Sequence, residues 1–220
     1  MDFKRIAGIC GIIFAGTVFT VNAFFVGPVK PMGDTELSEI VSYYTEHGDV
    51  VRLFAYVAPF AWVAISLFAA GVVVSTQSEG RQNGWAIMGA VGIATMIATF
   101  CGVVTADLAL AGRASTLAAN PQFTRVLWDY HMVLQILNFT FVAMALGGFA
   151  MAAVTSKTAP RLGKFSLLGA GLLLAASTQS LAGLNGTGPV SIVLPGFLVW
   201  LIFIITYSII MIRMAGSATT

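Results

Sequence analysis

The chain has 220 residues, of which 58% are hydrophobic and 9% are charged, and its mean hydropathy is +0.90. Soluble domains carry about 25% charged residues, so this composition excludes an ordinary soluble domain and indicates an all-α integral membrane protein. The formal net charge of +2 is too small and too dispersed to indicate nucleic-acid binding.

The chain begins with an apolar run over residues 6–27. A secretory signal has a shorter apolar region of about 7–15 residues, whereas a run of this length can cross a bilayer. We therefore predict an uncleaved first transmembrane helix. The small residues of "VNA" at 21–23 leave signal cleavage after this helix as the alternative.

The next stretch, "DTELSEIVSYYTEHG", predicts a short amphipathic helix near 35–47. Its apolar positions recur at i, i+3, i+4 and i+7, at Leu37, Ile40, Val41 and Tyr44. Asp34 is the predicted N-cap and Gly48 the predicted stop. We expect this helix to lie on the outer membrane surface or over the mouth of the bundle, with its apolar face down.

Five further spans follow, so that residues 1–220 form a single membrane domain of six transmembrane helices. We place these five spans near 51–75, 84–108, 125–154, 163–184 and 189–213. The connections between them concentrate Gly, Pro and charged residues, as turns require.

The basic residues predict the orientation of the six spans, because Lys and Arg tend to remain in the cytoplasm. With both termini cytoplasmic, the inner side holds Lys4, Arg5, Arg81, Lys157, Arg161, Lys164 and Arg213. The outer side then holds Lys30, Arg52, Arg113 and Arg125. This asymmetry predicts an even number of spans with both termini cytoplasmic.

A ridge of small residues runs along the third span. It repeats every four residues, at Ala86, Ala90, Ala94, Ala98, Gly102 and Ala106. Helices in lipid associate through such close backbone approach. The ridge predicts contact with another helix, either within the bundle or on a partner subunit or second copy.

Polar residues mark one side of the membrane, most clearly in "WDYHMVLQILNF" at 128–139. Counting inward from Trp128 at 1.5 Å per residue places His131 about 4–5 Å deep, Gln135 about 10 Å and Asn138 about 15 Å. His131, Gln135 and Asn138 are separated by four and three residues, so they share a helix face.

Polar residues from the other spans fall at a similar depth. We predict that these residues line an outward-open polar cavity: Asn22, Arg52, Tyr56, Asp107, Trp128, Asp129, His131, Gln135, Asn138 and Gln179. Ionisable residues within a membrane usually face an interior or a wet cavity. The alternative is a network in which the same polar groups satisfy one another and set the helix register.

The residue types favour no cofactor and no metal. His131 is the intramembrane histidine and His47 lies in the outer segment, so a bis-histidine haem is not expected. Cys10 and Cys101 lie apart in apolar runs, without a metal or redox spacing. Acid–base catalysis by His131 would require an acid from another span, such as Asp107.

The second half of the chain resembles a known type of protein. The stretch from "HMVLQILNFTFVAMALGG" through "LAG", followed by a Pro-Gly start and a last apolar helix ending at Arg213, resembles uncharacterised six-helix bacterial membrane families of the domain-of-unknown-function type. "RIAGI" at 5–9 and a histidine opening span four, here His131, fit the same layout. The resemblance implies a six-helix membrane fold and no activity.

Three functions remain open from the sequence. The first is binding of a small or lipid-like molecule in the outer cavity, or help in its transport. The second is an accessory subunit that packs on a larger membrane complex through the ridge of span three. The third, which we favour least, is an embedded enzyme that uses His131 and a nearby acid. Membrane lipids are expected partners in each case.

Overall fold

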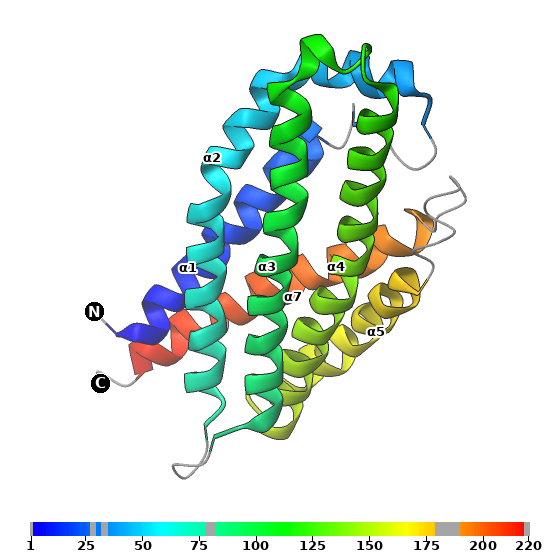
Figure 1. The fold of residues 1–220 in the computed structure, drawn as a ribbon. Helices are drawn as coiled ribbons and strands as arrows, with labels where there is room; N and C mark the ends of the chain where they lie inside the picture. The colour runs from blue at the N-terminus through cyan, green and yellow to red at the C-terminus, as the bar shows by residue number, and fades with distance from the viewer. Residues whose placement is uncertain (1, 27–29, 32–34, 78–81, 179–189, 218–220) are drawn as a thin grey trace.

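The computed structural model describes residues 2–26, 30–31, 35–77, 82–178 and 190–217, which form an all-helical bundle (Figure 1). Its helices, in chain order, are α1 (Phe3–Thr20), the π-helical η1 (Val21–Val26), α2 (Leu37–Ser75), α3 (Gly84–Gly112), the 3-10 helix η2 (Ala114–Thr116), α4 (Pro121–Thr155), α5 (Pro160–Ser177) and α7 (Val190–Ser217).

Local sequence explains where several helices begin. The Asp2 carboxylate accepts a hydrogen bond from the Lys4 backbone N–H at 2.7 Å, and Asn83 Oδ1 accepts one from the Trp85 N–H at 3.1 Å. Both are N-caps that satisfy otherwise unpaired N–H groups. Helices α4 and α5 begin instead with a proline, whose missing N–H is not needed in the first turn.

Helices that follow one another in the chain are neighbours in the bundle. The most extensive contacts join α3 to α4 and α4 to α5, and α1 packs against both α2 and α7. In Figure 1, α2 and α3 run side by side while α1 and α7 cross the view obliquely. Ala7, Gly71 and Met211 meet, so the start of α1 and the end of α7 lie beside the last turns of α2.

Five described helices are long and apolar enough to cross a membrane, which confirms the predicted class of helical membrane protein. They are Phe3–Ala23, Leu37–Ser75, Gly84–Gly112, Pro121–Thr155 and Ile192–Gly216. Helix α5 covers most of the predicted span 163–184, but the end of that span lies outside the described residues. The sixth span, the orientation and the cytoplasmic termini stay predictions.

The predicted helix near 35–47 is wrong as a separate element. Residues 37–75 form one continuous helix, and Gly48 does not end it. Gly48 is buried inside the helix, and a Cβ atom there would lie 3.7 Å from the Ala111 carbonyl oxygen, an ordinary van der Waals distance. Gly48 therefore packs against α3 without a contact that only glycine allows. The predicted N-cap, Asp34, lies outside the described residues. Ile40 and Tyr44 are buried, as expected for the inward face of this segment.

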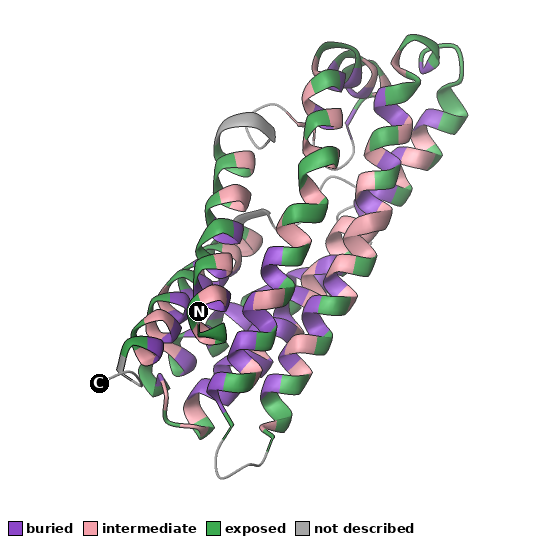
Figure 2. Cartoon of the chain, turned by 90° about the vertical axis from the view of Figure 1, so that its left-hand side faces the viewer, coloured by how far each residue is buried: buried purple, intermediate pink, exposed green. Residues whose placement is uncertain are grey.

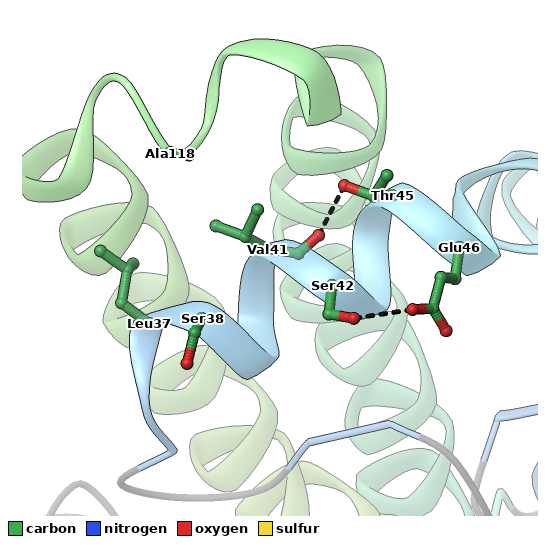
Figure 3. A pocket seen from close by; sticks show the side chains of 7 residues that line it. All are labelled: Leu37, Ser38, Val41, Ser42, Thr45, Glu46 and Ala118. Atoms are coloured by element: carbon green, nitrogen blue, oxygen red, sulfur yellow. Dashed lines mark hydrogen bonds between the residues drawn. The ribbon is translucent and has the colours of Figure 1, made fainter.

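The length of α2 explains how one helix contains both the predicted segment near 35–47 and the predicted span 51–75. Its 39 residues extend about 58 Å at 1.5 Å per residue, well beyond a hydrocarbon core of about 30 Å. Its first turns lie against the C-terminal end of α3 and the N-terminal end of α4. There Ile40 and Tyr44 join a buried cluster with Leu110 and Trp128. A shallow groove at this end is lined by Leu37, Ser38, Val41, Ser42, Thr45, Glu46 and Ala118 (Figure 3).

Small residues bring the helices together elsewhere, in contacts that we call the small-residue core: Gly8, Gly71, Gly89, Gly92, Gly148 and Gly163 with the groups that face them. A Cβ atom at Gly92 would lie 2.6 Å from the Ala145 backbone nitrogen. A Cβ atom at Gly163 would lie 2.5 Å from the Ala150 carbonyl oxygen. The backbones therefore approach too closely for any side chain, as helix pairs in lipid commonly do.

The predicted ridge on α3 is divided between two faces. Ala86 and Ala106 are buried, whereas Ala94 and Ala98 are exposed. The close contact with α4 is made by Gly89 and Gly92, which lie beside the ridge on the helix surface. Figure 2 shows that buried residues are densest in the lower half of the bundle. The polar residues of interest lie near the other end.

Candidate functional site

Asp107 and His131 lie on neighbouring helices and face each other. Asp107 sits five residues before the end of α3, and His131 sits in the third turn of α4. Because α3 and α4 are antiparallel neighbours, these positions fall at the same level. His131 Nε2 is 3.4 Å from Asp107 Oδ1. The structure thus brings His131 close to an acid from another span, which acid–base catalysis by His131 would require, although no reaction follows from this contact.

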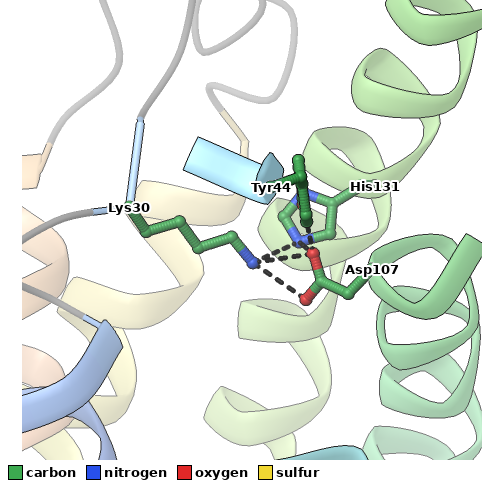
Figure 4. A network of polar contacts seen from close by, with 4 residues as sticks. All are labelled: Lys30, Tyr44, Asp107 and His131. Atoms are coloured by element: carbon green, nitrogen blue, oxygen red, sulfur yellow. Dashed lines mark hydrogen bonds and ion pairs between the residues drawn. The ribbon is translucent and has the colours of Figure 1, made fainter. Parts of the chain in front are cut away.

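Lys30 completes the group from outside the helices. It lies between η1 and α2, and its Nζ donates to Asp107 Oδ1 at 3.0 Å and to Oδ2 at 2.9 Å (Figure 4). The same Nζ is 3.0 Å from His131 Nε2. The Lys30 and Asp107 side chains are 13% and 16% exposed, so the ion pair is largely withdrawn from solvent.

Tyr44 adds a hydroxyl from α2. Its O–H donates to Asp107 Oδ1 at 2.5 Å. The ring is buried because it belongs to the apolar cluster at this end of the bundle. We call Lys30, Tyr44, Asp107 and His131 the polar cluster. Three helices and one connection therefore converge on a single carboxylate (Figure 4).

Aromatic rings enclose the polar cluster. Trp128 stacks on His131, with ring centroids 5.3 Å apart and an interplanar angle of 18°. Tyr44 meets Trp128 edge to face at 6.5 Å. On the other side of Tyr44, Tyr43 stacks on His47 at 5.2 Å. These rings hold His131 and Tyr44 in place and reduce the exposure of the ion pair to water.

The contacts determine which nitrogen of His131 carries its proton. A lysine ammonium is a donor with no acceptor, so His131 Nε2 must accept from Lys30. A neutral imidazole with Nε2 as the acceptor carries its proton on Nδ1. His131 Nδ1 is buried and has no hydrogen-bond partner among the described residues. The ring therefore holds one donor that the described contacts do not use.

Charge and burial explain why the Asp107 carboxylate has several hydrogen-bond partners. A buried ion pair is stabilising only when its geometry is good and its remaining polar atoms are satisfied. Asp107 accepts from Tyr44 and Lys30, so both carboxylate oxygens have donors. The single negative charge of Asp107 is balanced by the single positive charge of Lys30 when His131 is neutral.

The polar line continues along α4 below the polar cluster. Gln135 is half-buried. Asn138 is buried, and its Oδ1 has no hydrogen-bond partner among the described residues. These residues follow His131 on one helix face. Helix α4 therefore has two buried polar atoms without a described partner, His131 Nδ1 and Asn138 Oδ1.

Other residues that we predicted for the cavity lie elsewhere. Asn22 is exposed and donates to the Val18 carbonyl of its own helix at 2.8 Å. Arg52 binds the Ala111 carbonyl at 3.1 Å and Asp49 at 2.5 Å. Tyr56 is 72% exposed. None of the three makes a described contact with the polar cluster.

Two further predicted residues complete this account. Asp129 is half-buried and makes no described contact with the polar cluster, since it is two positions from His131 and turns to another side of α4. Gln179 lies outside the described residues. Of the predicted lining residues, the structure brings together Asp107, His131 and Trp128.

Sequence reasoning missed Lys30 and Tyr44 as members of the site. Lys30 lies in a connection, where no periodicity indicates which way the chain turns. It is, however, a basic residue in an outer segment otherwise rich in acids, and it could have been matched to Asp107 by charge. Tyr44 was placed correctly on the apolar face of its helix, and its hydroxyl is the signal that was not used.

The fold and the polar cluster define a helical membrane protein with an ion-pair site between its helices. Comparison of the chain with protein-family models, with curated proteins and with solved structures gives no match. The resemblance in layout therefore names no family for the chain. Among the residues that the structure describes, no three His, Cys, Asp or Glu side chains are grouped to hold a metal ion.

Proposed function

We propose that the chain is a six-span protein of a bacterial inner membrane, with both termini cytoplasmic, that binds a small or lipid-like molecule at its outer end or helps to transport it. The observation that carries this proposal is the polar cluster itself. A carboxylate, an imidazole and a tyrosine hydroxyl converge there from three helices. Ionisable groups placed between membrane helices commonly mark the path or the site of a ligand.

Unused polar atoms support this proposal over a purely structural network. His131 Nδ1 and Asn138 Oδ1 are buried without a partner among the described residues. A network that exists to fix helix register would be expected to satisfy its own members, because each unpaired buried group costs about 1–3 kcal/mol. A bound molecule could supply the missing partners.

Lys30 occupies the centre of the polar cluster, so binding there requires Lys30 to move aside. The groove near Leu37 and the groove around Pro59 both lie elsewhere, and neither is lined by His131. The arrangement thus corresponds to a closed form in which the chain's own ammonium fills the site.

Native mass spectrometry of the detergent-extracted protein tests the proposal. We expect the wild type to retain a non-covalent molecule that Asp107→Asn loses. Asp49→Asn is the matched control, because Asp49 is an acid near the same end whose side chain is 95% exposed. It should retain the molecule. Identical adducts on all three proteins, or none on the wild type, would contradict the proposal.

An accessory subunit is the second candidate, and the exposed part of the α3 ridge favours it. Ala94 and Ala98 are exposed, next to Val91, which is 51% exposed. Small residues on an outward face allow another helix to approach closely. The test is whether Ala98→Trp releases a co-purifying membrane protein that Ile13→Trp, on the exposed surface of α1, leaves bound.

A further inference from the structure

The contacts of Lys30 Nζ describe a binding site for a primary ammonium group. Such a group has three N–H donors and no acceptor. Asp107 Oδ1, Asp107 Oδ2 and His131 Nε2 lie within 3.0 Å of Nζ, so the carboxylate and the imidazole both accept from the ammonium group. The carboxylate also supplies the counter-ion for its positive charge.

The receptor and its occupant belong to different parts of the chain. Asp107, His131 and Tyr44 are carried by helices packed against one another, and stacking on Trp128 fixes the imidazole. Lys30 belongs to the connection between η1 and α2. The acceptors are therefore preorganised by the bundle, while the ammonium comes from a residue outside the described helices.

The unpaired atoms of α4 provide a second, independent observation. His131 is fully buried and its Nδ1 lacks a partner among the described residues. With Lys30 in place, His131 thus uses one of its two ring nitrogens. Asn138 Oδ1, two turns further along α4, is a second buried atom without a described partner. Both atoms could serve groups of a molecule larger than an ammonium ion.

We propose that Lys30 is an intramolecular occupant of a receptor site for primary ammonium groups, and that a primary amine is the ligand class that replaces it. The shared chemistry fits a free small amine and also the aminoethyl headgroup of a lipid. This inference rests on the proposed function, because it names the ligand class of the same site. It excludes quaternary ammonium groups, which carry the charge but no N–H donors.

Lys30→Ala empties the site and makes the proposal testable in purified protein. We expect its melting temperature to rise by about 3–5 °C in methylammonium chloride, in a saturable manner. Half-saturation is expected near or above about 5 mM, because a ligand of two heavy atoms cannot bind tightly. Tetramethylammonium chloride at the same ionic strength screens charge equally and should produce no such rise.

Two comparison proteins complete this experiment. The double variant Lys30→Ala with Asp107→Asn should not respond to methylammonium, because the acceptor carboxylate is gone. The wild type should require more methylammonium than Lys30→Ala, because the tethered Lys30 ammonium competes for the same acceptors. A folded Lys30→Ala protein that responds equally to the two salts would overturn the proposal.

Recovery of Lys30→Ala becomes the measurement if this variant aggregates when purified without amine. Monodisperse protein in methylammonium but not in tetramethylammonium would support the proposal, and aggregation in both salts would overturn it. The melting temperature of Lys30→Ala in nanodiscs distinguishes a lipid amine from a soluble one. Stabilisation of Lys30→Ala by ethanolamine-headgroup lipid over choline-headgroup lipid identifies a lipid ligand, whereas stabilisation by free ethanolamine alone identifies a soluble one.

The outcomes separate this inference from the proposed function. If methylammonium stabilises Lys30→Ala while the wild type retains no molecule, the receptor chemistry stands and the binding function fails. If the wild type retains a molecule that Asp107→Asn loses, yet no amine stabilises Lys30→Ala, the binding function stands and the ligand class is wrong.

Discussion

The small-residue core and the polar cluster hold helices together in opposite ways. In the small-residue core, backbones touch and the interaction depends on shape. At the polar cluster, three helices and a connection meet through charge and directed hydrogen bonds, among large aromatic rings. Lipid offers little hydrophobic drive for helix association, so membrane helices associate through close packing and through hydrogen bonds between polar groups.

The difference lies in how the interaction is distributed. The contacts of the small-residue core are spread over six helices, from Gly8 against the Ser208 carbonyl to Gly163 against the Ala150 carbonyl. The polar cluster instead depends on the single carboxylate of Asp107. A core of this kind suits permanent association, whereas a site that depends on one carboxylate can exchange its partner.

Gly148→Ala should have the largest effect on stability. Its Cβ atom would lie 2.5 Å from the Gly89 nitrogen and 2.7 Å from the Trp85 carbonyl oxygen, both of them backbone atoms that cannot rotate away. Helices α3 and α4 would have to separate, and overpacking of this kind costs about 3 kcal/mol. The melting temperature in detergent measures the loss.

Gly171→Ala is the matched control on α5. An added Cβ there meets no described atom within 4 Å, and alanine is favoured over glycine in a helix by about 1 kcal/mol. This variant should melt at the wild-type temperature or slightly above it. Equal losses for the two variants would show that close backbone contact does not explain the stability of this region.

Asp107→Asn should have the next largest effect. It keeps the shape of the side chain but removes the negative charge of the carboxylate, which balances Lys30 and accepts a hydrogen bond from Tyr44. Hydrogen bonds to a charged group contribute about 1.5–3 kcal/mol, so we expect a loss of about 2 kcal/mol. The same thermal measurement on Asp49→Asn should show almost no change, because exposed ion pairs contribute little.

Parts of this arrangement could be predicted from sequence because they follow from apolar length and helix spacing. Helix α3 begins at Gly84 as predicted, since Asn83 caps an apolar run. Asp107 and His131 are both predicted near the outer ends of adjacent spans, and their contact agrees with that placement. Such inferences need only the rise per residue and the order of the helices.

Other parts could not be predicted because they depend on tertiary contacts. Gly48 is a residue type that commonly ends helices, yet it lies inside α2, where it packs against Ala111. The path that brings Lys30 to Asp107 is set by a connection without periodicity. Asn22 and Tyr56 have suitable depth but face away, because depth alone does not specify the side of a helix.

Tyr44→Phe should sharpen the account of the polar cluster, with a smaller effect than Asp107→Asn. It removes one hydroxyl that donates to the carboxylate at 2.5 Å and leaves the ring in its apolar surroundings. We expect a loss of about 1.5 kcal/mol, at the lower end for a bond to a charged group. Tyr56→Phe, at an exposed position, should leave the melting temperature unchanged. Equal behaviour of the two variants would mean that the hydroxyl of Tyr44 does not stabilise Asp107.

Ser166→Ala should have the smallest effect, and of opposite sign. Ser166 is buried on α5, but its Oγ has no hydrogen-bond partner among the described residues. Removing an unpaired buried hydroxyl relieves its desolvation penalty and adds a better helix former, so a gain of up to about 1 kcal/mol is expected. Ser75→Ala is the control, because Ser75 Oγ lies 3.2 Å from the Tyr207 hydroxyl and should lose stability when truncated. A clear loss at Ser166 would show that hydroxyls stabilise the bundle away from the polar cluster too, and that the two regions differ less than their contacts indicate.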